Sequence, residues 1–284
     1  MTYAGLYQNA RQTLSRAGVA PAAFEARCLL EVLLGMDRMK LISAGTQSPS
    51  AEDEQRFLRA VAKRAEGYPL QYLLGKWQFM GRDFLVGEGV LIPRDDTEVA
   101  VRTCCEALKS LSAPTVLELC AGSGIIAVTL QKMLPAVQIT ALELMEDAFE
   151  YLQRNLRLHA CETIKALKAD LFSAYDQFED GSFDAIVSNP PYIAKGVLPT
   201  LQAEVHFEPQ TALDGGEDGL DFYRCIAKDW TPKLRKGGSI TLEIGEEQAS
   251  AVMSLLKAEG IGALRVEKDI QGLDRVIFGT KTTD

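Results

Sequence analysis

The sequence predicts an α/β protein in which a small all-helical domain precedes a mostly parallel β-sheet. From residue 114 onward, short apolar runs typical of buried strands alternate with helical patterns, and this alternation predicts a parallel sheet covered on both faces. Residues 1–75 carry helical patterns alone. The last two strand-like runs, 263–268 and 275–278, are separated only by a turn, so we expect the sheet to end in an antiparallel hairpin.

The N-terminal part has the apolar spacing of a helical bundle. Apolar side chains recur at helical intervals in four segments, namely residues 3–14, 21–35, 50–67 and 69–74. Pro21 is favoured at a helix start, Gly35 just after a helix end, and Ser50 as an N-cap. Core packing accounts for these patterns, so we expect no catalytic residue here. We predict that residues 1–75 form a separate domain.

A connector and a first helix follow. Aromatic residues on both sides of Gly81 predict a β-hairpin, and we assign residues 76–93 to the connector. The second domain then covers residues 94–284 and starts with a predicted helix over 97–111, whose acidic first turn suits the helix dipole.

The remaining elements of the second domain alternate along the chain. Strands are predicted at residues 115–119, 138–143, 164–169, 183–188 and 239–244. Helices are predicted at residues 125–134, 146–158, 220–234 and 247–259.

Composition excludes several classes of protein. Hydrophobic residues make up 47% of the 284, enough for a sizeable core. We find neither an apolar run long enough to span a membrane nor the basic-then-apolar layout of a signal peptide. The six cysteines form no Cys-x-x-Cys pair, and two histidines are too few for most metal sites. We therefore expect a cytoplasmic protein with free thiols, no bound metal and no membrane association.

The charge is unevenly distributed. The whole chain carries −9, but residues 1–75 contain nine Lys and Arg against seven Asp and Glu, a net +2. The rest of the chain therefore carries −11. Because contact with phosphates needs a basic surface, an acidic body argues against stable nucleic-acid binding.

A glycine-containing loop links the first predicted strand of the second domain to the next helix. Alone, Gly122-Ser123-Gly124 could serve NAD, FAD or packing. A dinucleotide fingerprint would have its third glycine at position 127, which is alanine here, a residue that is sometimes accepted. Glu118 comes just before the loop, where a carboxylate can pair with an ammonium group but would repel a pyrophosphate.

Two further acidic residues end the next two strands. Glu143 is placed to accept hydrogen bonds from a ribose diol. The run Asp170-Leu171-Phe172 offers an acceptor and an apolar surface for an adenine. An amino acid, a ribose and an adenine without phosphates describe S-adenosylmethionine, which we expect to be the cofactor.

The stretch Asn189-Pro190-Pro191-Tyr192 directly follows the predicted strand 183–188. The prolines stop the strand and stiffen the backbone, so the asparagine is held at the strand's carboxyl end, where open α/β sheets bind ligands. Its side chain offers an acceptor for a planar NH2 group, and the proline carbonyls are free to accept as well. Tyr192 adds a ring for a planar substrate. A simple Pro-rich turn is the alternative interpretation.

These motifs in this order resemble class I S-adenosylmethionine-dependent methyltransferases. In that group, Asn-Pro-Pro-Tyr is shared by enzymes that methylate adenine N6, guanine N2 or glutamine amides. The chain is most similar to the glutamine-N5 methyltransferases of peptide release factors, the PrmC or HemK family. The similarity extends over nearly the whole chain and is carried by residues 67–75, 91–98, 118–124, 187–193, 207–213 and 269–279.

Some positions differ from the family's usual residues. Cys120 and Ala121 stand where Gly-Thr is commoner, and Glu118 and Glu143 replace aspartates. Leu171 stands where an aromatic residue is often found. Charge and small size are kept, so the resemblance still implies activity.

The resemblance implies a role for each matching position. The methionine end of the cofactor would lie on Glu118, Cys120, Ala121, Gly122, Ser123 and Gly124. Glu143 would hold the ribose, with Asp170 and Leu171 beside the adenine and Asn189 at the methyl-transfer end. Asn189 and the Pro190 carbonyl would accept from the substrate amide, Tyr192 would flank its plane, and Pro191 would complete the substrate-binding set.

The resemblance implies methyl transfer to the glutamine of the Gly-Gly-Gln motif in class I peptide chain release factors. Residues 1–75 would dock the release factor, and the enzyme is expected to be a monomer. Two alternatives remain open. One is an amino-methyltransferase acting on adenine N6 or guanine N2 of nucleic acid, and the other is a non-catalytic protein that binds translation factors.

Overall fold

The structure, a computed structural model, describes residues 1–282. The chain divides into two compact units. The first comprises residues 1–77, 86–88 and 202–207, and the second comprises 78–85, 89–201 and the chain from 208 onward. The predicted domain limits at 75/76 and 93/94 stay a prediction, and residues 283–284 of the last predicted domain lie outside the described residues.

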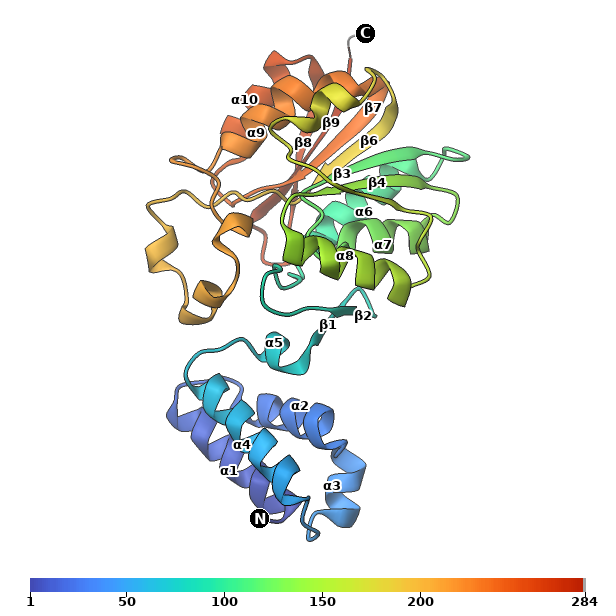
Figure 1. The fold of residues 1–284 in the computed structure, drawn as a ribbon. Helices are drawn as coiled ribbons and strands as arrows, with labels where there is room; N and C mark the ends of the chain where they lie inside the picture. The colour runs from blue at the N-terminus through green and yellow to red at the C-terminus, as the bar shows by residue number, and fades with distance from the viewer. Residues whose placement is uncertain (283–284) are drawn as a thin grey trace. The chain divides into compact units, whose positions relative to one another are not determined.

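The first unit is helical, as the sequence predicts (Figure 1). Its helices are α1 Tyr3–Arg16, α2 Ala22–Leu34, α3 Arg38–Ala44, α4 Ala51–Ala65 and α5 Leu70–Leu74. The predicted N-cap of α4 is confirmed, since the Ser50 side chain accepts from the backbone N–H of Asp53. Gly35 ends α2 in a left-handed conformation. The seven-residue α3, capped by Asp37, was not predicted.

A buried ion pair crosses the core of this unit. Arg64 on α4 donates to both carboxylate oxygens of Glu25 on α2, at 2.5 and 3.1 Å, and both side chains are 9% exposed. Segment 202–207 also belongs to this unit. Its Glu204 lies 3.1 Å from Arg64, and its Phe207 ring contacts Tyr68 at 5.3 Å.

We expect Glu25→Ala to lower the unfolding free energy of this unit by about 3 kcal/mol, because it leaves a buried guanidinium with less counter-charge. Glu204→Ala is the matched control. The Glu204 side chain is 43% exposed, so its loss should cost less than about 1 kcal/mol. Amide hydrogen exchange in α2 and α4 measures both effects. Equal protection in the two variants would contradict the prediction.

The predicted hairpin is confirmed. Strands β1 Lys76–Phe79 and β2 Arg82–Leu85 pair with each other in the described chain. Met80 and Gly81 between them both have positive φ, 46° and 76°, the backbone that tight two-residue hairpin turns require.

The second unit contains the predicted sheet. Within residues 1–282, seven strands join in the order β5-β4-β3-β6-β7-β9-β8. They are β3 Thr115–Leu119, β4 Gln138–Glu143, β5 Lys165–Lys168, β6 Phe183–Ser188, β7 Leu234–Glu243, β8 Ile261–Lys268 and β9 Asp274–Lys281. The first five in this order run parallel, and β9 pairs antiparallel with β7 and β8, so the predicted terminal hairpin is confirmed. The strand order reverses between β3 and β6, which places a ligand crevice at their carboxyl ends.

Helices cover both faces of this sheet (Figure 1). They are α6 Thr97–Leu108, α7 Ile125–Met133, α8 Glu146–Leu158, α9 Asp221–Cys225 and α10 Ala249–Ala258. The first three share a core with Val116 of β3, whereas α9 and α10 share one with Leu117. Neighbouring residues of a strand point to opposite faces, so β3 contributes to both cores.

The predicted helix 220–234 is wrong in its second half. The α-helix ends at Cys225, a π-helical turn covers Ile226–Trp230, and a 3-10 turn covers Thr231–Lys233. Pro232 cannot continue an α-helix. Strand β7 therefore starts at Leu234, five residues before the predicted strand.

Further 3-10 turns lie at Ala174–Gln177, Leu198–Thr200, Ala203–Phe207 and Gln210–Ala212. In the described part of the chain, the helices are too short or too polar to cross a bilayer.

Candidate active site

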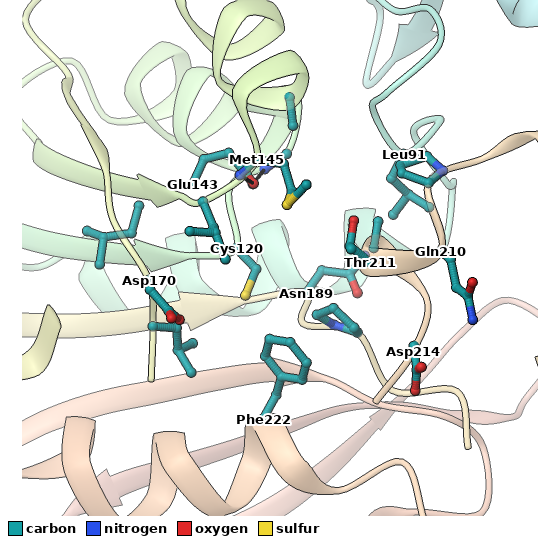
Figure 2. A pocket seen from close by; sticks show the side chains of 18 of the residues that line it. Leu91, Cys120, Glu143, Met145, Asp170, Asn189, Gln210, Thr211, Asp214 and Phe222 are labelled. Atoms are coloured by element: carbon teal, nitrogen blue, oxygen red, sulfur yellow. Dashed lines mark hydrogen bonds between the residues drawn. The ribbon is translucent and has the colours of Figure 1, made fainter. Parts of the chain in front are cut away.

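A cavity of about 410 Å³ opens at the carboxyl ends of the parallel strands. The loops after β3, β4, β5 and β6 contribute to its wall, as do segment 209–214 and Phe222 of α9. Figure 2 shows Glu143 and Asp170 on one side, the segment from Gln210 to Asp214 on the other, and Asn189 between them. Its size and position are those of a small-molecule site at a topological switch point.

The glycine loop after β3 turns sharply. Cys120, Gly122 and Gly124 have positive φ of 57°, 54° and 81°. Cys120 and Gly122 line the cavity. At Gly124 a Cβ atom would lie 2.5 Å from a methyl of Leu152 on α8, so this glycine permits close packing of the loop on a helix. Gly124 is not among the described residues that line the cavity, and its predicted role toward a cofactor stays a prediction.

Glu143 holds the loop from the next strand. Its Oε2 accepts from the backbone N–H of Gly122 and its Oε1 from that of Met145, both at 2.8 Å. Burial raises the pKa of Glu143, while the two backbone hydrogen bonds favour the charged form. Because a carboxylate has about four acceptor sites, it can still accept from a diol in the cavity.

Glu118 lies at a second, smaller cavity. Its Oε2 accepts from the backbone N–H of Ala127 at 3.0 Å, and burial raises its pKa well above the ordinary value. It lines this cavity, of about 30 Å³, together with Ala121, Ser123, Arg94 and Thr97. The two cavities share four lining residues, Leu91, Cys120, Gly122 and Asn189, so they adjoin each other.

Asp170 and Leu171 line the larger cavity, as does the next residue, Phe172. Asp170 Oδ1 accepts from the backbone N–H of Phe172 at 2.9 Å, which fixes the loop after β5. The ring of Phe172 meets that of Phe222 edge to face at 5.0 Å. The two rings give the cavity an aromatic wall.

Asn189 lines both cavities. Its Nδ2 donates to the hydroxyl of Thr97, the first residue of α6, at 3.2 Å. Pro191 lines the larger cavity. Pro190 and Tyr192 are not among the described residues that line either cavity, and the Tyr192 ring packs against the apolar core around β7. Their predicted contacts with a substrate amide stay predictions.

Several residues that sequence reasoning missed position the loops. Asn155 of α8 is fully buried, and its amide bonds both backbone groups of Leu85 and the carbonyl of Ser123. Gln248 donates to the carbonyl of Tyr192 at 2.9 Å. Among the lining residues, Met145 and Phe222 were also missed. None of these residues lies in a recognisable motif, although a polar Asn155 within an apolar helix face is a detectable signal.

Two family models match the chain. The PrmC N-terminal domain matches residues 5–75, and the methyltransferase small domain matches residues 91–208.

Residues 1–282 contain no group of three or more His, Cys, Asp or Glu side chains arranged to hold a metal ion.

Curated relatives are similar over almost their full length. A protein of Geobacter sulfurreducens is 41% identical over 273 residues, which cover 95% of this chain and 93% of the relative. One of Moorella thermoacetica is 38% identical, covering 97% of each, and one of Koribacter versatilis is 34% identical, covering 100% of each. Each of the three is described as "Release factor glutamine methyltransferase".

Solved structures share the fold. The catalytic domain of hMettl16 in complex with the MAT2A 3'UTR hairpin 6 aligns with a TM-score of 0.57 at 15% identity, over 82% of this chain and 83% of that one. A methyltransferase from Pyrococcus furiosus aligns with a TM-score of 0.51 at 18% identity, over 82% and 100%. At such low identity these similarities show the fold alone. The predicted class I methyltransferase architecture is confirmed.

Proposed function

Because the chain belongs to the family of release factor glutamine methyltransferases, we propose that it methylates a glutamine of a peptide chain release factor. The methyl group would come from S-adenosylmethionine. The acceptor would be the side-chain nitrogen, N5, of the glutamine in the Gly-Gly-Gln motif of class I release factors. The observation that carries the proposal is the position of Asn189. Its side chain donates to Thr97 and lines a cavity that Glu143 and Asp170 also line.

The cavity suits S-adenosylmethionine. Glu143 is placed to accept from a ribose diol, Asp170 from an adenine amino group, and the Phe172 and Phe222 rings offer apolar surface to the base. Of the described residues, no Lys or Arg lines the larger cavity, whereas three carboxylates do. A phosphate-bearing cofactor would find no positive counter-charge there, whereas a cationic sulfonium would find negative counter-charge.

The protein's part in the reaction is positioning and electrostatics. A carboxamide nitrogen is a poor nucleophile because its lone pair is delocalised into the carbonyl. Acceptance of its N–H groups by Asn189 and by the Pro190 carbonyl would aim the nitrogen at the methyl group and stabilise the positive charge that develops on it. When bound, the cofactor would supply an electrophilic methyl group whose sulfonium sulfur leaves as a neutral thioether, and the methylated amide would lose one N–H proton to water.

The test is transfer of a radiolabelled methyl group from S-adenosylmethionine to purified release factor, to duplex DNA and to RNA. We expect labelling of the release factor alone, on the Gly-Gly-Gln glutamine. The acidic charge of residues 76–284, −11, favours this outcome over nucleic-acid methylation. Labelling of nucleic acid in its place would overturn the proposal, and no labelling at all would favour a binding protein.

The ribose contact gives a separate prediction. Glu143→Ala should weaken S-adenosylmethionine binding by about 1.5–3 kcal/mol, roughly ten- to a hundredfold, since a diol loses a charged acceptor and Gly122 loses its partner. Glu150→Ala is the matched control, because it removes an exposed glutamate from α8, the helix that follows β4. Titration calorimetry measures both. Unchanged affinity in a folded Glu143→Ala protein would reject the assignment.

A further inference from the structure

A buried carboxyl group lies next to the site and has no part in the function proposed above. Glu243 is the last residue of β7 and is 1% exposed. Within residues 1–282, neither of its carboxylate oxygens has a hydrogen-bond partner. A buried carboxylate without partners is costly, so its retention needs a physical reason.

The groups that act on Glu243 come from α6 and the segment before it and from β9, and Glu243 acts on tyrosines of the loop after β6 and of α9. The Thr97 hydroxyl and the guanidinium groups of Arg275 and Arg94 favour its charged form, and Asp96 opposes it. The Tyr223 hydroxyl donates to the backbone carbonyl of Glu243 at 2.7 Å. Burial raises the pKa values of Tyr192 and Tyr223, and the Glu243 charge raises both further.

Both guanidinium groups form ion pairs with carboxylates other than Glu243. Arg275 pairs with Asp269 at 3.0 Å and with Asp96 at 3.5 Å, and Arg94 pairs with Glu208. The Thr97 hydroxyl acts on the Glu243 carboxyl as a hydrogen-bonding group that lowers its pKa, whereas the arginines act through their charge. Neither carboxylate oxygen is in hydrogen-bonding geometry with a partner among the described residues, so a bond between the two side chains requires the Thr97 hydroxyl to turn toward Glu243.

Thr97 has a second partner, Asn189, and its hydroxyl carries a single hydrogen. If that hydrogen points to Glu243, only lone pairs face Asn189, so the asparagine must turn its NH2 group toward Thr97. Its Oδ1 then faces the cavity. If the hydroxyl lost its acceptor, it could donate to Asn189 Oδ1, and the amide would turn its NH2 group into the cavity.

We propose that Glu243, acting through the Thr97 hydroxyl, fixes the orientation of the Asn189 amide so that its oxygen faces the substrate nitrogen. This rests on the proposed function, in which Asn189 accepts from the glutamine amide. Glu243 and Thr97 are positioning residues in this arrangement. The chain Glu243–Thr97–Asn189 joins the end of β7, the start of α6 and the end of β6.

The arrangement implies a pH dependence. Burial raises the pKa of Glu243 to about 7. Above this pH the carboxylate is charged and can only accept, which holds the Thr97 hydrogen. Below it the protonated group can itself donate to Thr97, which frees the threonine hydrogen to turn toward Asn189. Turnover should therefore fall as the pH drops through about 7.

The experiment measures kcat, KM and their pH dependence for methylation of release factor by the full chain. Thr97→Val keeps the side-chain shape and removes the hydroxyl, and Glu243→Gln keeps the volume and removes the charge. Each should lower kcat about tenfold, which is smaller than the loss of a transition-state hydrogen bond because some amides keep the correct orientation. Cofactor affinity should stay unchanged. Glu243→Gln should also lack the decline near pH 7.

The controls separate this role from a purely structural one. Thr97→Ser restores the hydroxyl and should restore kcat, and Glu246→Gln, at an exposed position beyond β7, should behave as wild type. The double variant Thr97→Val/Glu243→Gln should be no worse than either single variant, because the two residues act in series. If Glu243→Gln does not fold, the Thr97→Val and Thr97→Ser pair decides the question.

The outcomes distinguish two failures. If Asn189→Ala turns over normally, the proposed function is wrong about Asn189, and the proposed role of Glu243 is wrong with it. If Asn189→Ala is impaired but Thr97→Val and Glu243→Gln have wild-type kcat and pH profiles, only the positioning role is overturned.

Discussion

Asn189→Ala is expected to lower kcat for release factor methylation about 10²- to 10³-fold, the range measured when one preorganised hydrogen-bonding group is removed from an active site. In the structure, Asn189 lines the cavity and its Nδ2 is anchored on Thr97, so the side chain is held before substrate arrives. Binding of S-adenosylmethionine should change little, because Glu143 and Asp170 remain. Single-turnover kinetics and calorimetry measure the two effects separately.

Asn189→Asp is the finer test of the same residue. Aspartate keeps an acceptor for the substrate amide but cannot donate to Thr97, and it adds a negative charge next to the Thr97 hydroxyl. We expect activity between those of the wild type and the alanine variant. Gln138→Ala, at an exposed position at the start of β4, serves as the matched control. Near-normal methylation by Asn189→Ala would show that the Asn-Pro-Pro-Tyr stretch is only a turn.

Much of the fold follows from local pattern. Strands β3, β4 and β6 lie within one residue of their predicted limits because each is a short apolar run buried on both faces. The start of β7 was missed because its first five residues include Lys236, Gly237 and Gly238, which do not look like a buried strand. The strand begins at Leu234 because this residue lies opposite Phe183 of β6, and the register then shifts until Ser239 lies opposite Ala185, which is a tertiary effect.

Some residues of the site could be predicted from the sequence and others could not. Glu143, Asp170 and Asn189 were predictable because carboxyl ends of parallel strands share one edge of a sheet. Phe222 was not, since it comes from a helix that only the folded chain brings to the cavity. Glu243 could have been noticed, because a carboxylate at the end of an otherwise apolar strand is the same signal that identified Glu118 and Glu143.

Removal of residues 1–75 is expected to abolish most methylation of intact release factor while leaving binding of S-adenosylmethionine largely intact. A free glutamine offers few contacts, so selectivity for one glutamine must come from binding surface away from the reacting atoms. The cavity and all of its lining residues belong to the second unit. A short Gly-Gly-Gln peptide should be a poor substrate for the full chain and for the truncated chain alike.

Truncation alone does not separate the loss of docking from a change in the remaining chain. Residues 202–207 belong to the first unit and would lose Arg64 and Tyr68 as partners. Substitution of exposed residues avoids this problem. Met39 and Ile42 of α3 are 72% and 74% exposed, an unusual exposure for large apolar side chains. If residues 1–75 dock the release factor through this helix, Met39→Ser/Ile42→Ser should raise KM for release factor about tenfold, the effect of losing a well-packed interface anchor.

The matched control is Leu158→Ser, which changes a half-exposed leucine on α8 of the second unit and should leave KM unaltered. Methylation of the peptide should be the same in all these proteins, since the variants leave the Asn189 cavity unchanged. A raised KM only for intact release factor would place the docking surface on α3, whereas loss only on truncation would place it elsewhere in residues 1–75. If the truncated chain modified intact release factor as well as the full chain does, the helical unit would serve stability and not substrate selection.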